Sequence, residues 1–273
     1  MIDRRHKHWT ETLFVHHPEL FLPWMEQMKT FAQPQVEGLR KIFQKHGVRG
    51  GGRILDLACG LGRISIYLAK AGYNVVGIDI SPLYLRLAQK WATKESVDDK
   101  TIFYRMDARK APRLLANRED RFDAVVNMGT SMGFYGEAYD RRVFHSLRAV
   151  TSRRGVLVVE TVNRDYLVRH FQEQNISEIG KIVWSDARRL DLESSFMRNS
   201  WKFYRKERGS LRLIVDVPVS HRVYSLHELR TLLFSGGWDC LESYGSLREL
   251  TPLTTDSFHM TLVARRRASA SRI

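Results

Sequence analysis

Two glycines and an aspartate stand at a spacing that suits the binding of a nucleoside. Gly60 and Gly62 follow the short apolar stretch 53–57, and a turn with so little side chain lets the backbone approach a ligand closely. Asp79 comes about twenty residues after the first glycine, at the end of a second apolar stretch. A carboxylate at that place can accept hydrogen bonds from both hydroxyls of a ribose. These residues therefore predict a ligand site that recognises a nucleoside.

The residues around this site predict the elements that position it. Apolar residues in 53–57 fit a buried strand, and residues 63–71 have a helical period that ends at Gly72. Ser81 and Pro82 favour a second helix, because serine caps a helix and proline suits its first turn. Further strands are expected at 74–79, 101–105, 121–128, 154–160, 238–244 and 258–264, and further helices at 137–150 and after Ser225.

The stretch Asp56-Leu-Ala-Cys-Gly-Leu-Gly62 resembles the first motif of class I S-adenosylmethionine (SAM)-dependent methyltransferases. In that family an acid at the end of the first strand precedes a glycine turn. Ala58 replaces the commoner first glycine, and this small-for-small change is expected to leave the turn intact. The alternative is a dinucleotide turn for NAD. It is disfavoured because a third glycine is missing and because an acid stands where a dinucleotide turn has a glycine.

The resemblance extends over about residues 53–264 and implies an α/β fold: a Rossmann-like seven-stranded sheet with helices on both faces and an antiparallel last strand. It implies SAM as the cofactor, with S-adenosylhomocysteine as the product and no metal. In the family, Ile80 would pack on adenine and Asp107 would recognise its amino group. A turn or helix-capping role is the alternative for Asp107. The implied cofactor site comprises Asp56, Ala58, Cys59, Gly60, Gly62, Asp79, Ile80, Asp107, Ala108, Asn127 and Met128.

The stretch Asn127-Met-Gly-Thr130 follows the fourth strand, where the family brings its methyl group. Enzymes that methylate exocyclic amines of bases usually carry Asn/Asp-Pro-Pro-aromatic there, and cytosine-C5 enzymes carry Pro-Cys. The chain has neither, so both DNA readings are disfavoured. The catalytic residue is not identified by the sequence.

Two residues are candidates for a catalytic role. Glu160 ends the fifth strand and could orient or deprotonate an acceptor atom, or it could be a structural partner of Arg164 or Arg169. Tyr135 lies in the loop 130–136, which could line a pocket or anchor the following helix in the core.

Three parts of the chain are expected. Residues 1–50 would form an N-terminal helical lid, residues 51–265 the methyltransferase domain, and residues 266–273 a basic tail. Trp9 and Phe14 would either cover the site or staple the N-terminal helix to the core. A helix from Phe21 to about His46 is expected, with a break at Pro34.

Residues 181–222 alternate loosely between apolar and polar side chains, with a hairpin turn at Gly209-Ser210. This pattern predicts a small antiparallel β insertion, which in similar enzymes covers the substrate or mediates dimerisation. The histidines near the N-terminus (His6, His8, His16, His17) have no acid or cysteine partner at ligand spacing, so no metal site is expected there.

The composition sets outer bounds. The chain has 273 residues, 43% of them hydrophobic, which is enough for one large domain with a full core. The charged N-terminus and the lack of a long apolar run predict neither a signal peptide nor a membrane span. Two cysteines suggest no disulfide framework, and a cytoplasmic location is expected.

The net charge is +14, from 44 Lys+Arg against 30 Asp+Glu. It suits either a solvated arginine-rich surface or attraction to RNA or an anionic substrate. The main interpretation is a SAM-dependent methyltransferase, monomer or homodimer, acting on O, N or C of a small molecule. The alternatives are an RNA or protein methyltransferase that uses the basic surface, and a non-catalytic SAM-binding scaffold.

Overall fold

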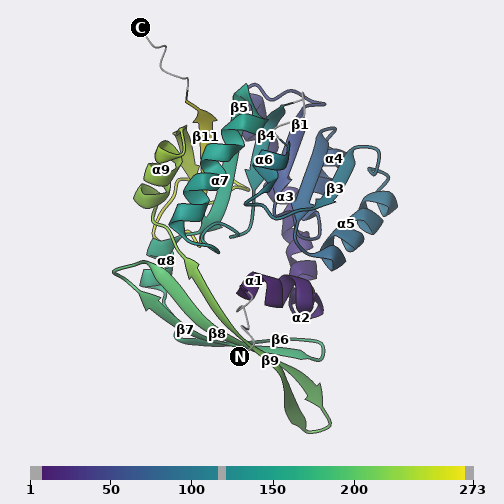
Figure 1. Ribbon diagram of the computed structural model, residues 1–273, viewed down its shortest axis with the longest axis vertical. Coiled ribbons are helices and arrows are strands. Elements are labelled where there is room, and N and C mark those ends of the chain that lie inside the picture. Colours follow the sequence, from purple (N-terminus) through teal and green to yellow (C-terminus); the bar gives the residue numbers. More distant parts are fainter. Residues whose placement is uncertain (1–7, 116–120, 268–273) are drawn as a thin grey trace, which may run out of the picture.

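The computed structural model describes residues 8–115 and 121–267, in which a seven-stranded sheet forms the centre of the molecule (Figure 1). Its strand order is β10-β11-β5-β4-β1-β2-β3. Neighbouring strands from β5 to β3 run parallel, and β11 runs antiparallel to both β5 and β10. This confirms the predicted Rossmann-like sheet. The strands are β1 (Arg53–Leu57), β2 (Asn74–Asp79), β3 (Thr101–Arg105), β4 (Phe122–Asn127), β5 (Thr151–Val162), β10 (Trp238–Tyr244) and β11 (His259–Arg266).

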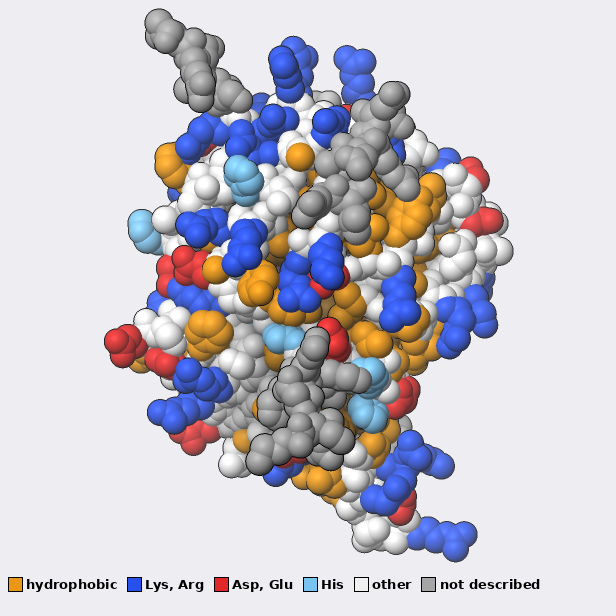
Figure 2. Space-filling view, in the orientation of Figure 1, with side chains coloured by type: hydrophobic (Ala, Val, Ile, Leu, Met, Phe, Trp, Pro, Cys, Tyr) orange, Lys and Arg blue, Asp and Glu red, His pale blue; other side chains and the backbone are white. Residues whose placement is uncertain are grey.

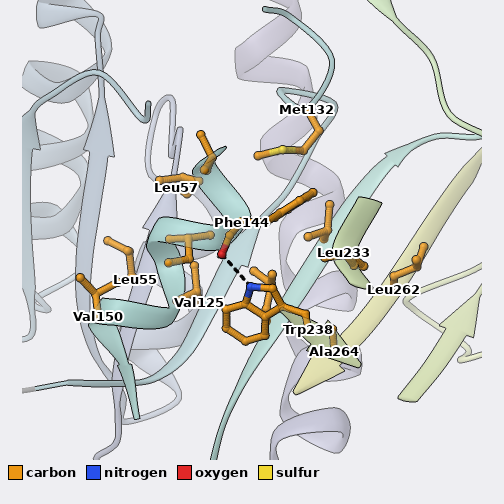
Figure 3. Packing of buried hydrophobic residues seen from close by; sticks show 14 of the residues in the cluster. Leu55, Leu57, Val125, Met132, Phe144, Val150, Leu233, Trp238, Leu262 and Ala264 are labelled. Carbon is orange, nitrogen blue, oxygen red and sulfur yellow. Dashed lines mark hydrogen bonds between the residues drawn. The ribbon is translucent and has the colours of Figure 1, made fainter. Parts of the chain in front are cut away.

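Helices cover both faces of the sheet, because successive residues of a buried strand point to opposite sides. Ile54 of β1 packs into one apolar layer and its neighbour Leu55 into the other. In the second layer, shown in Figure 3, Trp238 Nε1 donates a hydrogen bond to the Phe144 carbonyl at 2.7 Å. The first layer contains α3 (Ala32–Lys45), α4 (Arg63–Lys70) and α5 (Pro82–Lys94), and the second contains α6 (Ala111–Leu115), α7 (Glu137–Val150) and α9 (Leu226–Ser235).

The N-terminal segment is a series of short helical pieces rather than the expected helix from Phe21 to His46. They are α1 (Trp9–Glu11), the π-helical turn η1 (Thr12–His16), α2 (Pro18–Gln27) and the 3-10 turn η2 (Met28–Phe31), followed by α3. The break therefore falls at η2 and not at Pro34. Pro34 lies in the first turn of α3, where a missing backbone N–H removes no helical hydrogen bond.

A second, four-stranded antiparallel sheet, here called the added sheet, is formed by residues 174–222. Its strands are β6 (Gln174–Ile179), β7 (Ile182–Asp191), β8 (Phe196–Glu207) and β9 (Ser210–Arg222). Gly209 makes the β8–β9 turn with φ of 74°, as its hairpin position predicts. The sheet begins before the expected residue 181, because β6 pairs along β7. Residues of β6 are half-buried or exposed, which left little apolar pattern in the sequence.

The added sheet lies beyond the carboxyl ends of the parallel strands, with α1 and α2 between the two sheets (Figure 1). The short helix α8 (Arg164–Arg169) links β5 to it. Both cysteines, Cys59 and Cys240, are free. Among the helices of the described residues, none is long and apolar enough to cross a membrane. Most of the predicted basic tail, residues 268–273, lies outside the described residues.

Candidate active site

A cavity of about 490 Å³ lies at the carboxyl ends of the parallel strands. Residues that follow β1, β2, β3 and β4 form its floor, as the crevice rule for open α/β sheets predicts. Residues of β7, β8 and β9 form the opposite wall, and α1, η1 and α2 close one side. One space is thus lined by three separate parts of the chain.

The turn after β1 brings the backbone to the cavity floor. Ala58, Gly60 and Gly62 all have positive φ, at 59°, 56° and 72°. A Cβ on Gly60 would lie 2.6 Å from Cε of Met25, so a side chain there would displace this methionine of α2. The turn also forms with Ala58 in place of a glycine, although a left-handed conformation costs a residue with a Cβ about 1–2 kcal/mol.

Asp79 is held at the end of β2 by the backbone on both sides of it. Its Oδ2 accepts a hydrogen bond from the Gly60 amide at 2.9 Å, and its Oδ1 accepts one from the Ser81 amide at 2.8 Å. Burial raises the pKa of Asp79, and these backbone hydrogen bonds oppose the rise. Each carboxylate oxygen can accept a further hydrogen bond, and Asp79 lines the cavity. This edge can therefore bind a pair of neighbouring hydroxyls.

Three predicted cofactor residues do not line the cavity but lie behind its floor. Asp56 is buried and accepts a hydrogen bond from Ser65 Oγ at 2.6 Å, and burial raises its pKa to about 6. Gly62 is the N-cap of α4. Asn127 Nδ2 donates to the Leu57 carbonyl at 2.7 Å. The other predicted residues do line the cavity: Ala58, Cys59, Gly60, Asp79, Ile80, Asp107, Ala108 and Met128.

Asp107 and Tyr135 belong to one cluster at the cavity edge. Asp107 accepts hydrogen bonds from the Arg109 guanidinium with both oxygens, the shortest at 2.6 Å, and from the Arg109 amide. The guanidinium lies 3.7 Å from the Tyr135 ring centroid, and His8 stacks on the same ring at 4.3 Å. Tyr135 Oη and Thr10 Oγ1 share a hydrogen bond of 2.6 Å. The cluster therefore fastens the N-terminal segment over the cavity, and burial raises the pKa of Tyr135.

Glu160 is buried, does not line the cavity, and contacts a residue that the sequence did not single out. Gln35 Nε2 donates to both carboxylate oxygens, at 3.1 and 3.2 Å, and Gln35 Oε1 accepts from Arg63. Arg63 does line the cavity. The alternative partners for Glu160, Arg164 and Arg169, instead pair with Asp165 and Asp256. Glu160 thus anchors a chain of contacts that ends at Arg63.

Most residues of the wall opposite the floor were not predicted from the sequence; Trp9, Phe14 and the loop 130–136 were. It combines large aromatic rings with polar side chains from the added sheet. Trp9 Nε1 donates to the Ser220 carbonyl at 3.0 Å, which ties α1 to β9. For the strands of the added sheet, the sequence showed only the loose alternation of β7–β9, whose inward positions include polar residues. The lining residues of this wall include Trp9, Phe14, Phe21, Phe134, Trp184, Asp186, Arg188, Asn199, Trp201 and His221.

Comparison with known proteins identifies the domain. A methyltransferase domain family matches residues 54–155. A putative methyltransferase of Bacillus subtilis, YqeM, is 33% identical over 128 residues, which cover 46% of this chain and 49% of that protein. A putative methyltransferase of Geobacillus sp. (strain WCH70) is 26% identical over 87% of this chain and 95% of that protein. The glycine/sarcosine N-methyltransferase of Aphanothece halophytica is 30% identical over 53% of each chain.

Solved structures share the fold at low sequence identity. A SAM-dependent methyltransferase from Clostridium acetobutylicum has a TM-score of 0.72 and 13% identity, over 86% of this chain and 92% of that one. The CcbJ methyltransferase of Streptomyces caelestis has a TM-score of 0.72 and 18% identity, over 87% and 90%. Residues 54–155 thus match a methyltransferase domain, and the sheet order and fold of the chain are those of the SAM-dependent methyltransferases that it resembles in structure.

The first relatives match this chain over only part of their length. The chain spans about half the length of the first two relatives, 49% and 53%. Within residues 8–115 and 121–267, no group of three or more His, Cys, Asp or Glu side chains is arranged to hold a metal ion.

Proposed function

We propose that the protein transfers the methyl group of SAM to an oxygen, nitrogen or carbon atom of a small-molecule acceptor. The observation that carries this proposal is the single cavity that joins the glycine turn and Asp79 to the aromatic wall of the added sheet. Its volume falls within the range usual for small-molecule sites. A donor and an acceptor can therefore be held side by side in one space.

The floor residues fit the cofactor in this proposal. Asp79 would accept the ribose hydroxyls, Ile80 would pack on adenine, and Gly60 would leave room for the backbone to approach the amino-acid end. Arg109 already binds the Asp107 carboxylate. The adenine amino group would therefore contact residues next to Asp107 as well as the carboxylate itself. When bound, SAM supplies an activated methyl group on a sulfonium. The chain's own residues then have mainly to align donor and acceptor, which can lower a barrier by several kcal/mol.

A small acceptor is favoured over RNA by the positions of the arginines. Four arginines lie close together: Arg121, Arg148, Arg153 and Arg266. Burial lowers the pKa of Arg266 most, and the charges of the other three lower it further. Arg121 and Arg153 stand at the amino ends of β4 and β5, Arg148 in the last turn of α7 and Arg266 at the end of β11, all at the sheet edge opposite the cavity. Figure 2 shows many Lys and Arg side chains over this half of the molecule, and others over the projecting end of the added sheet. A polyanion bound by these four arginines would lie at the sheet edge opposite the cavity.

The acceptor atom is left open by the relatives. Those named as N-methyltransferases include the enzyme from Aphanothece halophytica and the sugar N-methyltransferase KedS8 of Streptoalloteichus. An O-methyltransferase of ubiquinone biosynthesis from Actinobacillus pleuropneumoniae is also similar. The solved neighbour CalS10 is described as SAM-bound, which supports SAM as the cofactor here.

Calorimetry and turnover test the proposal together. The full chain is expected to bind S-adenosylhomocysteine and not NADH, and to release S-adenosylhomocysteine from SAM when small acceptors are supplied. No binding of S-adenosylhomocysteine would remove the proposal. Binding of SAM without turnover across a broad acceptor panel would favour the scaffold alternative, and salt-sensitive RNA binding that competes with turnover would favour an RNA substrate.

A further inference from the structure

The cavity face of the added sheet carries a row of polar side chains. In antiparallel strands, directly opposed residues lie on the same face. Asp186 of β7 is opposed to Trp201 of β8, and Arg188 is opposed to Asn199. Trp184 stands two residues before Asp186 and therefore shares its face. All five line the cavity, so this strip faces the space in which an acceptor would lie.

Asp186 carries an incompletely paired charge within this strip. Its side chain is only 3% exposed. Arg188 Nε donates to Oδ2 at 2.5 Å, while Oδ1 is buried and has no hydrogen-bond partner among the described residues. The Trp201 indole approaches closely enough to lower the pKa of Asp186, against the rise caused by burial, but without the geometry of a hydrogen bond. A buried carboxylate oxygen left without a donor is costly.

The neighbours of Asp186 are unpaired in the same way. Trp184 Nε1, Trp201 Nε1, Asn199 Oδ1 and His221 Nδ1 are buried, and none has a hydrogen-bond partner in the described part of the chain. The outer face of the same strands differs, because Asp216 there accepts a hydrogen bond from Ser200 at 2.9 Å and pairs with Lys202 at 3.7 Å. Buried polar groups in native proteins are nearly always paired, so the unpaired cavity face points to a ligand that supplies the partners.

The chemistry of these atoms selects an amine. The unpaired charged atom is an acceptor, Asp186 Oδ1, so it needs an N–H or O–H donor, and a cationic donor gains most from it. The Trp184 and Trp201 rings beside it attract cations through their faces. Arg188 does not reverse this preference, because its side chain is 26% exposed and its remaining N–H groups can be hydrated. The indole N–H groups can in turn donate to an oxygen of the same molecule.

We propose that the acceptor is a small molecule with a primary or secondary amine, bound through Asp186 Oδ1 beside the rings of Trp184 and Trp201. The inference rests on the proposed function, since it names the acceptor class for the same cavity. Before the transfer, the bound ammonium loses one proton to solvent and becomes the free amine. The lone pair of the free amine then forms the new N–C bond while the S–C bond breaks and its electron pair stays on sulfur, and the product is the methylated ammonium.

Sets of probes that share a skeleton and differ in one group test the inference. One set is 2-phenylethylamine, 2-phenylethanol and 3-phenylpropanoate, and a second is D-glucosamine, D-glucose and D-glucuronate. Binding to the full chain, saturated with S-adenosylhomocysteine, is followed by tryptophan fluorescence. Methyl transfer from labelled SAM is followed in parallel. In at least one set the amine is expected to bind about 10-fold or more tightly than both counterparts, as a hydrogen bond to a charged group allows, and to be methylated.

Two matched variants locate the effect. Asp186→Asn is expected to abolish the amine's advantage. Asp216→Asn, which removes a carboxylate from the outer face of the added sheet, is expected to keep it. Binding of S-adenosylhomocysteine and the thermal unfolding midpoint show that each variant is folded. The wild-type comparison needs no variant, so the test stands even where Asp186→Asn fails to fold.

The failures are distinguishable. If no amine binds more tightly than its alcohol and carboxylate counterparts, or if the advantage survives Asp186→Asn in a folded protein, the inference is overturned while methyl transfer stands. Preference for the carboxylate members would assign the site to an anion held by Arg188 and would also overturn it. Loss of S-adenosylhomocysteine binding by the wild-type chain would instead remove the proposed function itself.

Discussion

The floor and the opposite wall of the cavity treat their polar groups differently. On the floor, Asp79 is held by two backbone amides and Asp107 by Arg109. On the wall of the added sheet, Asp186 Oδ1 and Asn199 Oδ1 are buried without a hydrogen-bond partner among the described residues. The two floor carboxylates therefore already have partners within the protein, and a cofactor can bind beside them without rearranging them. The wall has hydrogen-bonding capacity that the protein itself does not use, as expected where a second ligand contributes the partners.

The largest expected effect is the loss of cofactor affinity when Asp79 of the floor is replaced. Asp79→Ala leaves the amides of Gly60 and Ser81 without their acceptor and removes the proposed acceptor of the ribose hydroxyls. Since a hydrogen bond to a charged group contributes about 1.5–3 kcal/mol, affinity for S-adenosylhomocysteine should fall about 100-fold or more. Calorimetry measures this. Asp99→Ala, at an exposed carboxylate, is the control, and equal affinities for the two variants would contradict the role given to Asp79.

A pH dependence of stability tests how the floor holds its buried acid. Burial raises the pKa of Asp56 from 3.8 to about 6, so the folded chain binds this proton more tightly than the unfolded chain. The contribution of Asp56 to the free energy of unfolding should therefore fall as the pH rises from about 4 to about 6, by on the order of 3 kcal/mol. Denaturant unfolding of the wild type and of Asp56→Asn across this range measures the difference.

A second variant should shift the pKa of Asp56 in a known direction. The Ser65 hydroxyl hydrogen bond lowers the pKa of Asp56 against the effect of burial. Ser65→Ala should therefore raise that pKa further and extend the loss of stability to higher pH. A stability difference between the wild type and Asp56→Asn that does not change with pH would show that Asp56 is not a buried acid of this kind.

The floor could be predicted from the sequence because its rules are local. A glycine turn follows its strand directly, and the carboxyl ends of parallel strands meet at one edge. The placement of Asp79 and Ile80 beside Gly60 and Cys59 followed from these rules. These rules do not predict which of the residues line the cavity and which lie behind it. Asp56 and Asn127 end strands as expected, but their side chains turn toward Ser65 and Leu57.

The wall could not be predicted because its contacts join distant parts of the chain. The same is true outside the wall, because Gln35 binds Glu160 from 125 residues away, whereas the sequence drew attention to arginines nearby. Asp186 and Asn199 come together only through the pairing of β7 with β8. A polar residue at every second position of a strand normally indicates a solvent-facing side. The docking of the N-terminal helical pieces onto the added sheet, which includes the Trp9 hydrogen bond to β9, makes this side an interior wall.

Two asparagines turn the comparison into a matched experiment. Asn127 Nδ2 donates to the Leu57 carbonyl and to Ser131 Oγ at 2.6 Å, although its Oδ1 is unpaired. Asn127→Leu leaves both acceptors without a donor and should lower the free energy of unfolding by about 2 kcal/mol. Asn199→Leu removes a buried oxygen that has no partner and should raise it by about 1 kcal/mol. Denaturant unfolding measures both, and equal losses would erase the distinction between floor and wall.

The smallest effect concerns strain that the floor retains at Ala58. Its φ of 59° lies in the left-handed region, which glycine adopts at no steric cost. Glycine gains entropy in the unfolded chain, so Ala58→Gly should stabilise by only about 0.5–1 kcal/mol. The control is Ala88→Gly, a buried position inside α5, where the same change should destabilise by about 1 kcal/mol. If both substitutions destabilise alike, the turn does not hold Ala58 in a strained conformation, and the floor is no more strained there than in its helices.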